Sequence, residues 1–330
     1  GEVLAARPQG FAPVLVATRA ALRGGDTDAA LARLDTLAAD LTRPQRRLAD
    51  ALRGHVLDRR DDPAGATRAW LAAHAGLDSP RARPTLRPLP PSLAEAIGNA
   101  RAAGAIGTSR NPHALLIGTP GSGVERAAAL LADAQGALVL ADRYGRNPRH
   151  DEFEAPQLGR YMGEISDEDA RLFARHYVKP LERAGVPSER ALIDWLPHFD
   201  AQFLPIIHRT FGPTRLVVVQ RGERAELLDW LAYGGAHGYR IDSLESARSH
   251  LALAHQHLEF AREHGAMPVL VLDGNALVAD PAAAVEALAR FLELPAWTPG
   301  DAWQRSARAL GGLPAQLPAG RDLAYAASLD

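Results

Sequence analysis

The chain has 330 residues, of which 47% are hydrophobic and 23% are charged, as is usual for a globular protein of about two domains. Its formal net charge of −2 argues against a nucleic-acid binder, which would carry a basic excess. The lack of cysteine excludes disulfides and cysteine-based catalysis, and no apolar run is long enough to predict a membrane span. No signal peptide is recognisable, so we expect a cytoplasmic protein.

The N-terminal part of the chain predicts helices only. Residues 20–40 and 56–76 align at an offset of 36 residues, with Asp26 on Asp62 at the start of a helix in each. In the same alignment Ala30 falls on Ala66, and Leu34 on Trp70. This offset is close to the period of about 34 residues found in tetratricopeptide hairpins. We therefore predict an all-α, tetratricopeptide-like domain over residues 1–78 that docks on the next domain or on a protein partner; a plain four-helix lid is the alternative.

Residues 79–110 are predicted to connect two domains. The segment 79–91, SPRARPTLRPLPP, is rich in proline, which excludes both the interior of a helix and a central strand. A short helix is expected near 93–103.

From residue 111 to the end, short apolar runs alternate with helical patterns. Such runs are typical of parallel strands that are buried on both faces of a sheet. The predicted strands are 114–118, 137–141, 191–194, 215–220 and 268–273. The alternation predicts an α/β domain with a P-loop-like parallel sheet flanked by helices, and with ligands at the carboxyl ends of the strands.

Three helix starts are predicted from capping residues in this part of the chain. Ser166 is expected to cap a helix over 167–185. Asp242 and Glu245 have the spacing of a capping box for a helix over 243–264. Asp280 followed by Pro281 predicts an N-cap and a first helical residue.

The stretch 118-GTPGSGVER-126 has the glycine spacing of a phosphate-binding loop at the start of a helix. Backbone N–H groups there can point at an anion. The lysine and hydroxyl residue that complete the usual nucleotide motif are replaced by Val124 and Glu125. This replacement argues against a nucleotide hydrolase, which needs both groups. A simple tight strand-to-helix turn is the alternative to an anion site.

Several segments resemble, in order, the bacterial sulfotransferases that carry tetratricopeptide repeats and use 3′-phosphoadenosine 5′-phosphosulfate (PAPS). The glycine-rich stretch stands where that family has its 5′-phosphosulfate loop. The segment 193-IDWLP-197 is similar to the family's Asp-Lys-x-Pro element, and 215-RLVVVQRGERAELLDW-230 to its 3′-phosphate strand and loop. Residues 269–295 and the terminal 319-AGRDLAYAASL-329 resemble the family's last two conserved segments.

The resemblance implies a set of donor-binding residues. They are Gly118, Gly121, Ser122 and Gly123 for the 5′-phosphosulfate, and Arg221, Arg224 and Arg321 as cations for phosphate. The sequence departs from the family at Gly121, where a cation is usual, and at Asp229, where a serine is usual. Glu125 and Asp229 both add negative charge where the donor is already polyanionic.

Sulfuryl transfer also needs a base for the acceptor's proton. Asp142, shortly after the second predicted strand, is the first candidate for this base, with loop capping as its alternative role. Asp194, expected at a strand end, is the second, and His198 is the third. No metal site is predicted, since His255 and His257 do not share a helix face.

Two functions follow from the resemblance and from these departures. The first is a PAPS-dependent sulfotransferase that acts on a hydroxyl or amine of an unidentified small molecule or protein. The second is a degenerate member of that fold that serves as a binding or scaffold protein and no longer binds PAPS.

Overall fold

The computed structural model describes residues 10–37, 41–75, 86–106, 112–141, 165–196, 199–211, 213–233, 241–309 and 313–329. The chain divides into two compact units. Unit 1 comprises 1–83, 222–249 and 306–330, and unit 2 comprises 84–221 and 250–305. The C-terminal segment and the segment after the fourth strand therefore pack with the N-terminal helices, whereas the sequence assigned both to the α/β domain of 111–330. No helix among the described residues is both long enough and apolar enough to cross a membrane.

Unit 2 is built on a five-stranded sheet in which every pairing is parallel, in the order β2-β3-β1-β4-β5. The strands are β1 His113–Gly118, β2 Ala137–Ala141, β3 Ala191–Leu196, β4 Thr214–Gln220 and β5 Val269–Asp273. They confirm the five predicted strands. In β1 every residue is buried, as expected for a central strand with helices on both faces.

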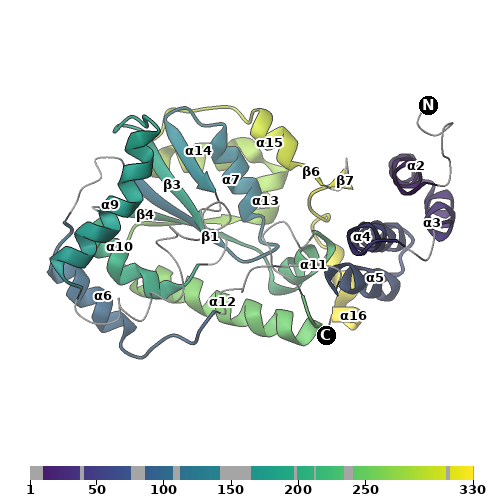
Figure 1. Cartoon of the computed structure of the whole chain (residues 1–330), viewed down its shortest axis with the longest axis horizontal. Helices are drawn as coiled ribbons and strands as arrows, with labels where there is room; N and C mark the ends of the chain where they lie inside the picture. The colour runs from purple at the N-terminus through teal and green to yellow at the C-terminus, as the bar shows by residue number, and fades with distance from the viewer. Residues whose placement is uncertain are drawn as a thin grey trace. The chain divides into compact units, whose positions relative to one another are not determined.

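Alternate side chains of the central strands enter two separate cores. One core joins Leu115 and Ile117 of β1 to α9 Asp167–Arg183, α10 Leu204–Thr210 and the part of α12 Leu244–His264 that lies in unit 2. The other joins Ala114 and Leu116 of β1 to α7 Val124–Ala132, α13 Gly274–Ala279 and α14 Pro281–Leu292. Figure 1 shows these two sets of helices on opposite faces of the sheet. The split follows from the two-residue period of a strand.

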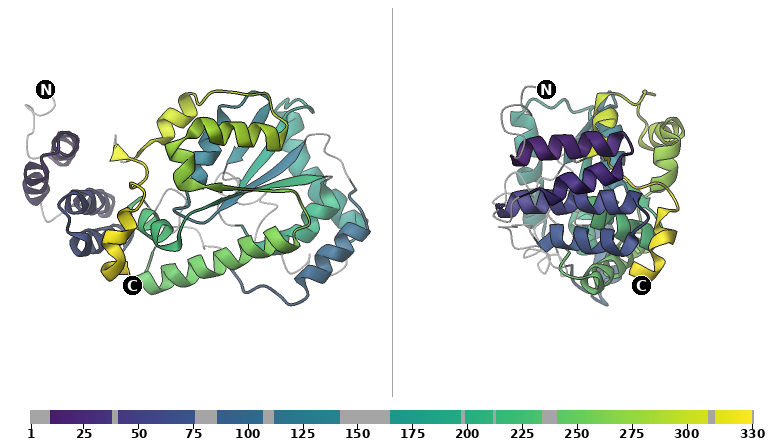
Figure 2. Two further views of the ribbon diagram at one scale, coloured as in Figure 1. Left: turned by 180° about the vertical axis from the view of Figure 1, so that it is seen from behind. Right: turned by 90° about the vertical axis from the view of Figure 1, so that its right-hand side faces the viewer.

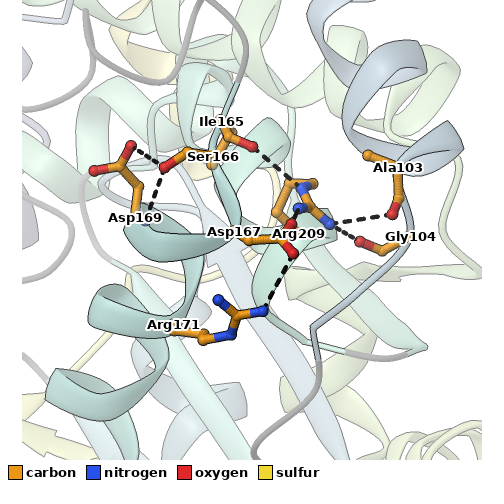
Figure 3. A network of polar contacts seen from close by, with 8 residues as sticks. All are labelled: Ala103, Gly104, Ile165, Ser166, Asp167, Asp169, Arg171 and Arg209. Atoms are coloured by element: carbon orange, nitrogen blue, oxygen red, sulfur yellow. Dashed lines mark hydrogen bonds and ion pairs between the residues drawn. The ribbon is translucent and has the colours of Figure 1, made fainter.

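A buried arginine joins three helices on the first of these faces (Figure 3). Arg209, in α10, is 3% exposed. Its guanidinium donates to the carbonyls of Ala103 and Gly104, just beyond the end of α6 Leu93–Ala102, and to the carboxylate of Asp167 at the start of α9. The cation therefore satisfies carbonyls at a helix C-terminus, where positive charge is favourable.

The predicted helix starts are confirmed in two of three cases. Ser166 accepts from the backbone N–H of Asp169, and Asp280 accepts from that of Ala283. The predicted box of Asp242 and Glu245 is wrong, because Ser243 exchanges hydrogen bonds with Ser246 instead and α12 begins at Leu244. The capping box therefore lies one residue further on, and its backbone donor is the N–H of Ser246 rather than that of Glu245.

Four helices of unit 1 form two hairpins that run side by side (Figure 2, right). They are α2 Phe11–Arg23, α3 Thr27–Asp35, α4 Arg43–Arg59 and α5 Pro63–Ala75. Asp26 accepts from the N–H of Ala29 at the start of α3, and Asp62 accepts from that of Gly65 near the start of α5. The aligned pairs of the predicted repeat are all buried: Ala30, Ala66, Leu34 and Trp70. The sequence repeat therefore corresponds to two hairpins whose second helices begin in the same way.

Unit 1 also contains α11 Glu223–Tyr233, the 3-10 helix η3 Arg321–Tyr325 and α16 Ala326–Leu329, which pack against α4 and α5. Short elements of its C-terminal segment are β6 Arg308–Ala309 and β7 Leu313–Pro314, paired antiparallel. Two further elements among the described residues are η2 Ala201–Phe203, in unit 2, and α15 Asp301–Ser306, whose last residue falls in unit 1.

Candidate functional site

The glycine-rich stretch forms a tight turn between β1 and α7. Gly121 and Gly123 have φ of 82° and 89°, the left-handed region in which a side chain is strained. A Cβ added at Gly118 would lie 2.6 Å from the hydroxyl of Ser122 and 2.9 Å from the carbonyl of Val219. Three glycines are therefore needed to bring this backbone close to the end of the neighbouring strand β4.

Two hydroxyl groups are buried in the turn. Thr119 and Ser122 are 1% and 0% exposed, and neither hydroxyl oxygen has a hydrogen-bond partner among the described residues. The backbone N–H of Ser122 is already used, because it donates to the Thr119 carbonyl at 3.1 Å. In the first turn of α7, the N–H of Arg126 donates to the carbonyl of Gly123 at 2.9 Å. The turn thus places two buried hydroxyls at the N-terminus of a helix, where an anion is favourable.

Arg221, immediately after β4, places a cation at this turn. Its Nη1 donates to the carbonyl of Gly121 at 3.2 Å, and its Nε donates to Oδ1 of Asn275 at 2.9 Å. Asn275 belongs to α13, which Asp273 caps at the end of β5. A Cβ added at Gly274 would lie 2.0 Å from the Ser122 carbonyl. The carboxyl ends of β1, β4 and β5 therefore meet around one turn.

The topology of the sheet makes this edge a suitable place for a ligand. The chain passes from β1 to α7 on one face, and from the neighbouring strand β3 to α10 on the other face. Parallel α/β sheets bind ligands outside the carboxyl ends of their strands, where successive connections take opposite faces. The glycine turn lies at that position.

The structure brings five of the predicted donor-binding residues together: Gly118, Gly121, Ser122, Gly123 and Arg221. The other two predicted cations, Arg224 and Arg321, belong to unit 1. Arg224 lies in the first turn of α11 and is half-buried. The predicted convergence of all three arginines on one phosphate site therefore stays a prediction.

Arg321 is engaged with two carboxylates of unit 1. Its Nε donates to Asp58 at 2.8 Å and its Nη1 to Asp61 at 2.8 Å. Burial lowers the pKa of Arg321, but the bonds to these two carboxylates raise it overall. Asp229, expected beside the phosphate, is buried and accepts from the backbone N–H of Leu317 at 2.9 Å. Both residues thus hold the C-terminal segment within unit 1.

Asp194 is interior to β3, not at its end as predicted, because the strand continues to Leu196. Its carboxylate is fully buried; Oδ2 lies 2.9 Å from Nε2 of His113 and accepts from the hydroxyl of Tyr177 at 2.6 Å. The other ring nitrogen of His113 lies 3.1 Å from the hydroxyl of Thr214. The hydrogen-bonded series Thr214–His113–Asp194 resembles a nucleophile–histidine–aspartate array. Because all three residues are buried, a structural role for Asp194 is favoured over the role of a base. Asp142 and His198 lie outside the described residues.

The two charged residues after the turn, Glu125 and Arg126, have different surroundings. Arg126 is 7% exposed, and its guanidinium carbon lies 3.5 Å above the ring of Trp303. It also donates to the Trp303 carbonyl, and burial lowers its pKa to about 10. Glu125 is half-buried in the first turn of α7, where it complements the helix dipole. Arg126 is thus directed to α15, whereas a carboxylate remains at the helix start.

Sequence reasoning missed Thr119 and Asn275. A signal for Asn275 was present, since the run DGN follows the fifth predicted strand and parallel strands end at the same edge. Thr119 stands inside the glycine motif itself, directly after Gly118. No signal in the sequence distinguishes its buried hydroxyl from an ordinary turn threonine.

No family model matches the chain, and no curated protein matches its sequence at a significant level. Within the described ranges, no three histidine or acidic side chains are grouped as ligands of a metal ion. A function is therefore inferred from the geometry of the glycine turn.

Proposed function

We propose that the glycine turn of unit 2 binds the 5′-phosphosulfate of PAPS, and that the protein transfers the sulfuryl group to a hydroxyl or amine acceptor. The observation that carries the proposal is the position of Arg221, whose guanidinium donates to the carbonyl of Gly121. The order of the parallel strands and the resemblance in the sequence both support a P-loop-like, sulfotransferase-like unit.

Arg221 offers an explanation for the missing cation at position 121. A side chain at Gly121 would have to adopt a φ near 82°, which is strained for any residue other than glycine. A guanidinium that reaches the same turn from the end of β4 avoids this strain. It can donate to two phosphate or sulfate oxygens with a planar pair of N–H groups.

In the proposed reaction, the bond between sulfur and the bridging oxygen of PAPS breaks, and a bond forms between sulfur and the acceptor oxygen or nitrogen. The leaving group is 3′,5′-diphosphoadenosine, whose 5′-phosphate keeps the bridging oxygen. Arg221 would stabilise the charge that develops there. The acceptor's proton passes to a base, for which Asp142 stays the sequence prediction.

A second candidate is a sulfotransferase-like scaffold that no longer binds PAPS. It is favoured by Glu125, which is half-buried in the first turn of α7. A carboxylate at this position competes with an anionic ligand for the positive end of the helix. The two candidates differ in one measurable property, the affinity for the donor nucleotide.

Unit 1 is proposed to be a tetratricopeptide-like pair of hairpins. The equivalent caps Asp26 and Asp62, and the burial of Ala30 and Ala66, support this reading. Two hairpins expose helix faces on which a protein partner can dock.

Titration of the full chain with 3′,5′-diphosphoadenosine by calorimetry tests the proposal. We expect a dissociation constant of about 1–100 μM. Arg221→Met should weaken binding by about tenfold to hundredfold, because a charged hydrogen bond is lost. Arg215→Met is the matched control, since Arg215 lies in β4, the strand that Arg221 follows, and pairs with the exposed Glu293.

Glu125→Thr should strengthen binding in the same titration, because it removes a carboxylate from the anion site. Transfer of labelled sulfate from PAPS to a panel of phenols and amines then tests the chemistry. A folded protein that shows no heat with millimolar nucleotide would contradict the enzyme and favour the scaffold.

A further inference from the structure

The run 273-DGN-275, where β5 ends and α13 begins, packs against Arg221. A Cβ added at Gly274 would lie 2.9 Å and 3.0 Å from Cγ and Cδ of Arg221, so the aliphatic stem of the arginine lies directly on this glycine. Asp273 caps α13, because its Oδ1 accepts from the backbone N–H groups of Asn275 at 2.7 Å and of Ala276 at 3.3 Å. The cap thus fixes the backbone that carries the Asn275 side chain, and the glycine leaves room for the arginine.

Two hydrogen bonds set the orientation of the Arg221 guanidinium. Its Nε donates to Oδ1 of Asn275 at 2.9 Å, and its Nη1 donates to the carbonyl of Gly121 at 3.2 Å. The guanidinium is planar and its N–H groups have fixed directions, so two acceptors on different nitrogens define its plane. One acceptor belongs to the backbone of the glycine turn, and the other is the side chain of Asn275.

The chemical nature of the Asn275 acceptor matters as much as its position. Arginine only donates hydrogen bonds, so the amide oxygen of Asn275 faces Nε, and an amide oxygen carries no net charge. Arg321, by contrast, is held by the carboxylates of Asp58 and Asp61. A carboxylate at position 275 would hold Arg221 at least as tightly, but it would oppose the attraction of the cation for an anion.

We propose that Asn275 is a positioning residue of the anion site, which orients the guanidinium of Arg221 with a neutral oxygen so that the cation can bind the phosphosulfate. The inference rests on the proposed donor binding at the glycine turn, and it adds the residue that prepares the cation of that turn. Asn275 acts through Arg221 rather than on the sulfur. Asn275, Arg221 and Gly121 all belong to unit 2.

Two variants of the full chain separate the orientation of Arg221 from the charge beside it. Asn275→Ala removes the acceptor and should weaken the binding of 3′,5′-diphosphoadenosine by about twofold to tenfold, because the ligand must then also immobilise the arginine side chain. Asn275→Asp keeps an acceptor of the same shape, and it should weaken binding by about tenfold to hundredfold, because the carboxylate offsets the cation. A purely structural role of Asn275 predicts the opposite order, since aspartate holds an arginine at least as well.

Nitrogen NMR of the chain labelled at arginine measures the orientation of Arg221 without any ligand. The Nε signal of Arg221 is assigned by its absence in Arg221→Met. Asn275→Ala should shift this signal and speed the exchange of its proton with water, whereas Asn275→Asp should keep the proton protected. Asn99→Asp is the matched control, because it adds the same charge at an exposed position of α6, which packs on the face of the sheet opposite to α7. It should bind the nucleotide as the wild type does.

Two results would overturn the inference while the donor proposal stands. One is a nucleotide affinity of Asn275→Asp that equals or exceeds that of the wild type, and the other is an Nε signal of Arg221 that Asn275→Ala leaves unchanged. If the wild type binds no nucleotide, the donor proposal fails, and titration with inorganic sulfate then decides the inference. A response of the Arg221 signal to sulfate that is weaker in Asn275→Asp supports the positioning role, and no response to sulfate overturns it.

Discussion

At the scale of the residue, the surroundings of a guanidinium decide its role. Arg209 is buried against helix-end carbonyls, and Arg126 lies over the ring of Trp303. Arg321 is paired with carboxylates within unit 1, whereas Arg221 contacts an amide oxygen and a turn carbonyl. In the sequence these arginines are equivalent cations. The distances place Arg221 at the glycine turn.

His55 makes stability depend on pH. Burial lowers the pKa of His55 from 6.5 to about 4, so the unfolded chain takes up the proton first as pH falls. The free energy of unfolding should therefore be unaffected above pH 6.5 and should fall between pH 6.5 and about 4, by about 3 kcal/mol. Urea unfolding at several pH values measures it, and His55→Gln should remove this part of the slope.

His176→Gln serves as the control for this measurement, because His176 is exposed on α9. It should retain the pH slope of the wild type. If His55→Gln and the wild type lose stability in parallel between pH 6.5 and about 4, the prediction that the buried imidazole of His55 is neutral in the folded protein is wrong.

At the level of the helix, the effect on stability of replacing a glycine depends on which atoms lie opposite it. Gly54 is interior to α4, and a Cβ added there would lie 2.2 Å from Nε1 of Trp70 in α5. Gly98 is exposed in α6, and an added Cβ would meet no atom within 4 Å. Helix propensity alone favours alanine equally at both sites.

We expect Gly54→Ala to destabilise the protein by about 1–3 kcal/mol, because the close packing of α4 on α5 leaves no room for a methyl group. Gly98→Ala should instead stabilise it by about 0.5–1 kcal/mol. Denaturant unfolding of the two variants against the wild type measures both changes. A stabilised Gly54→Ala protein would show that α4 and α5 are not packed as described.

At the scale of the whole molecule, the two compact units are not continuous in sequence. The C-terminal segment belongs with the N-terminal helices: Leu313 joins the core of α2–α4, and the ring of Tyr325 stacks on Trp70 at 5.9 Å. The hydroxyl of Tyr325 also donates to Asp58. The predicted boundary near residue 78 leaves these contacts out.

Removal of residues 306–330 should therefore expose the helices of residues 10–75 to hydrogen exchange and proteolysis, while the sheet of unit 2 keeps its protection. Tyr325→Phe keeps the ring on Trp70 and loses only one hydrogen bond, so we expect it to cost about 1 kcal/mol and to retain the protection. Unchanged protection of 10–75 after the truncation would support a self-contained domain over 1–78.

Local pattern was sufficient for the five strands of the sheet and for most of the predicted helix starts. Apolar runs located all five strands, because a strand buried on both faces has almost no polar positions. Three helix starts were recognised from their capping side chains, because a cap accepts from backbone N–H groups two or three residues further on. The caps are Asp62, Ser166 and Asp280. The glycine spacing after β1 likewise predicted the turn, since left-handed backbone requires glycine.

Tertiary structure decided which distant residues meet. The strand order brings Arg221 and Asn275 to Gly121, and it places Asp194 in a buried cluster rather than at an open strand end. In unit 1, the packing of the C-terminal segment brings Arg321 into contact with Asp58, and His55 lines a cavity. The donors and acceptors of each residue can be read from the sequence, but their partners follow from packing between distant segments. Arg221 and Gly121 are 100 residues apart in the chain, and Arg321 and Asp58 are 263 apart.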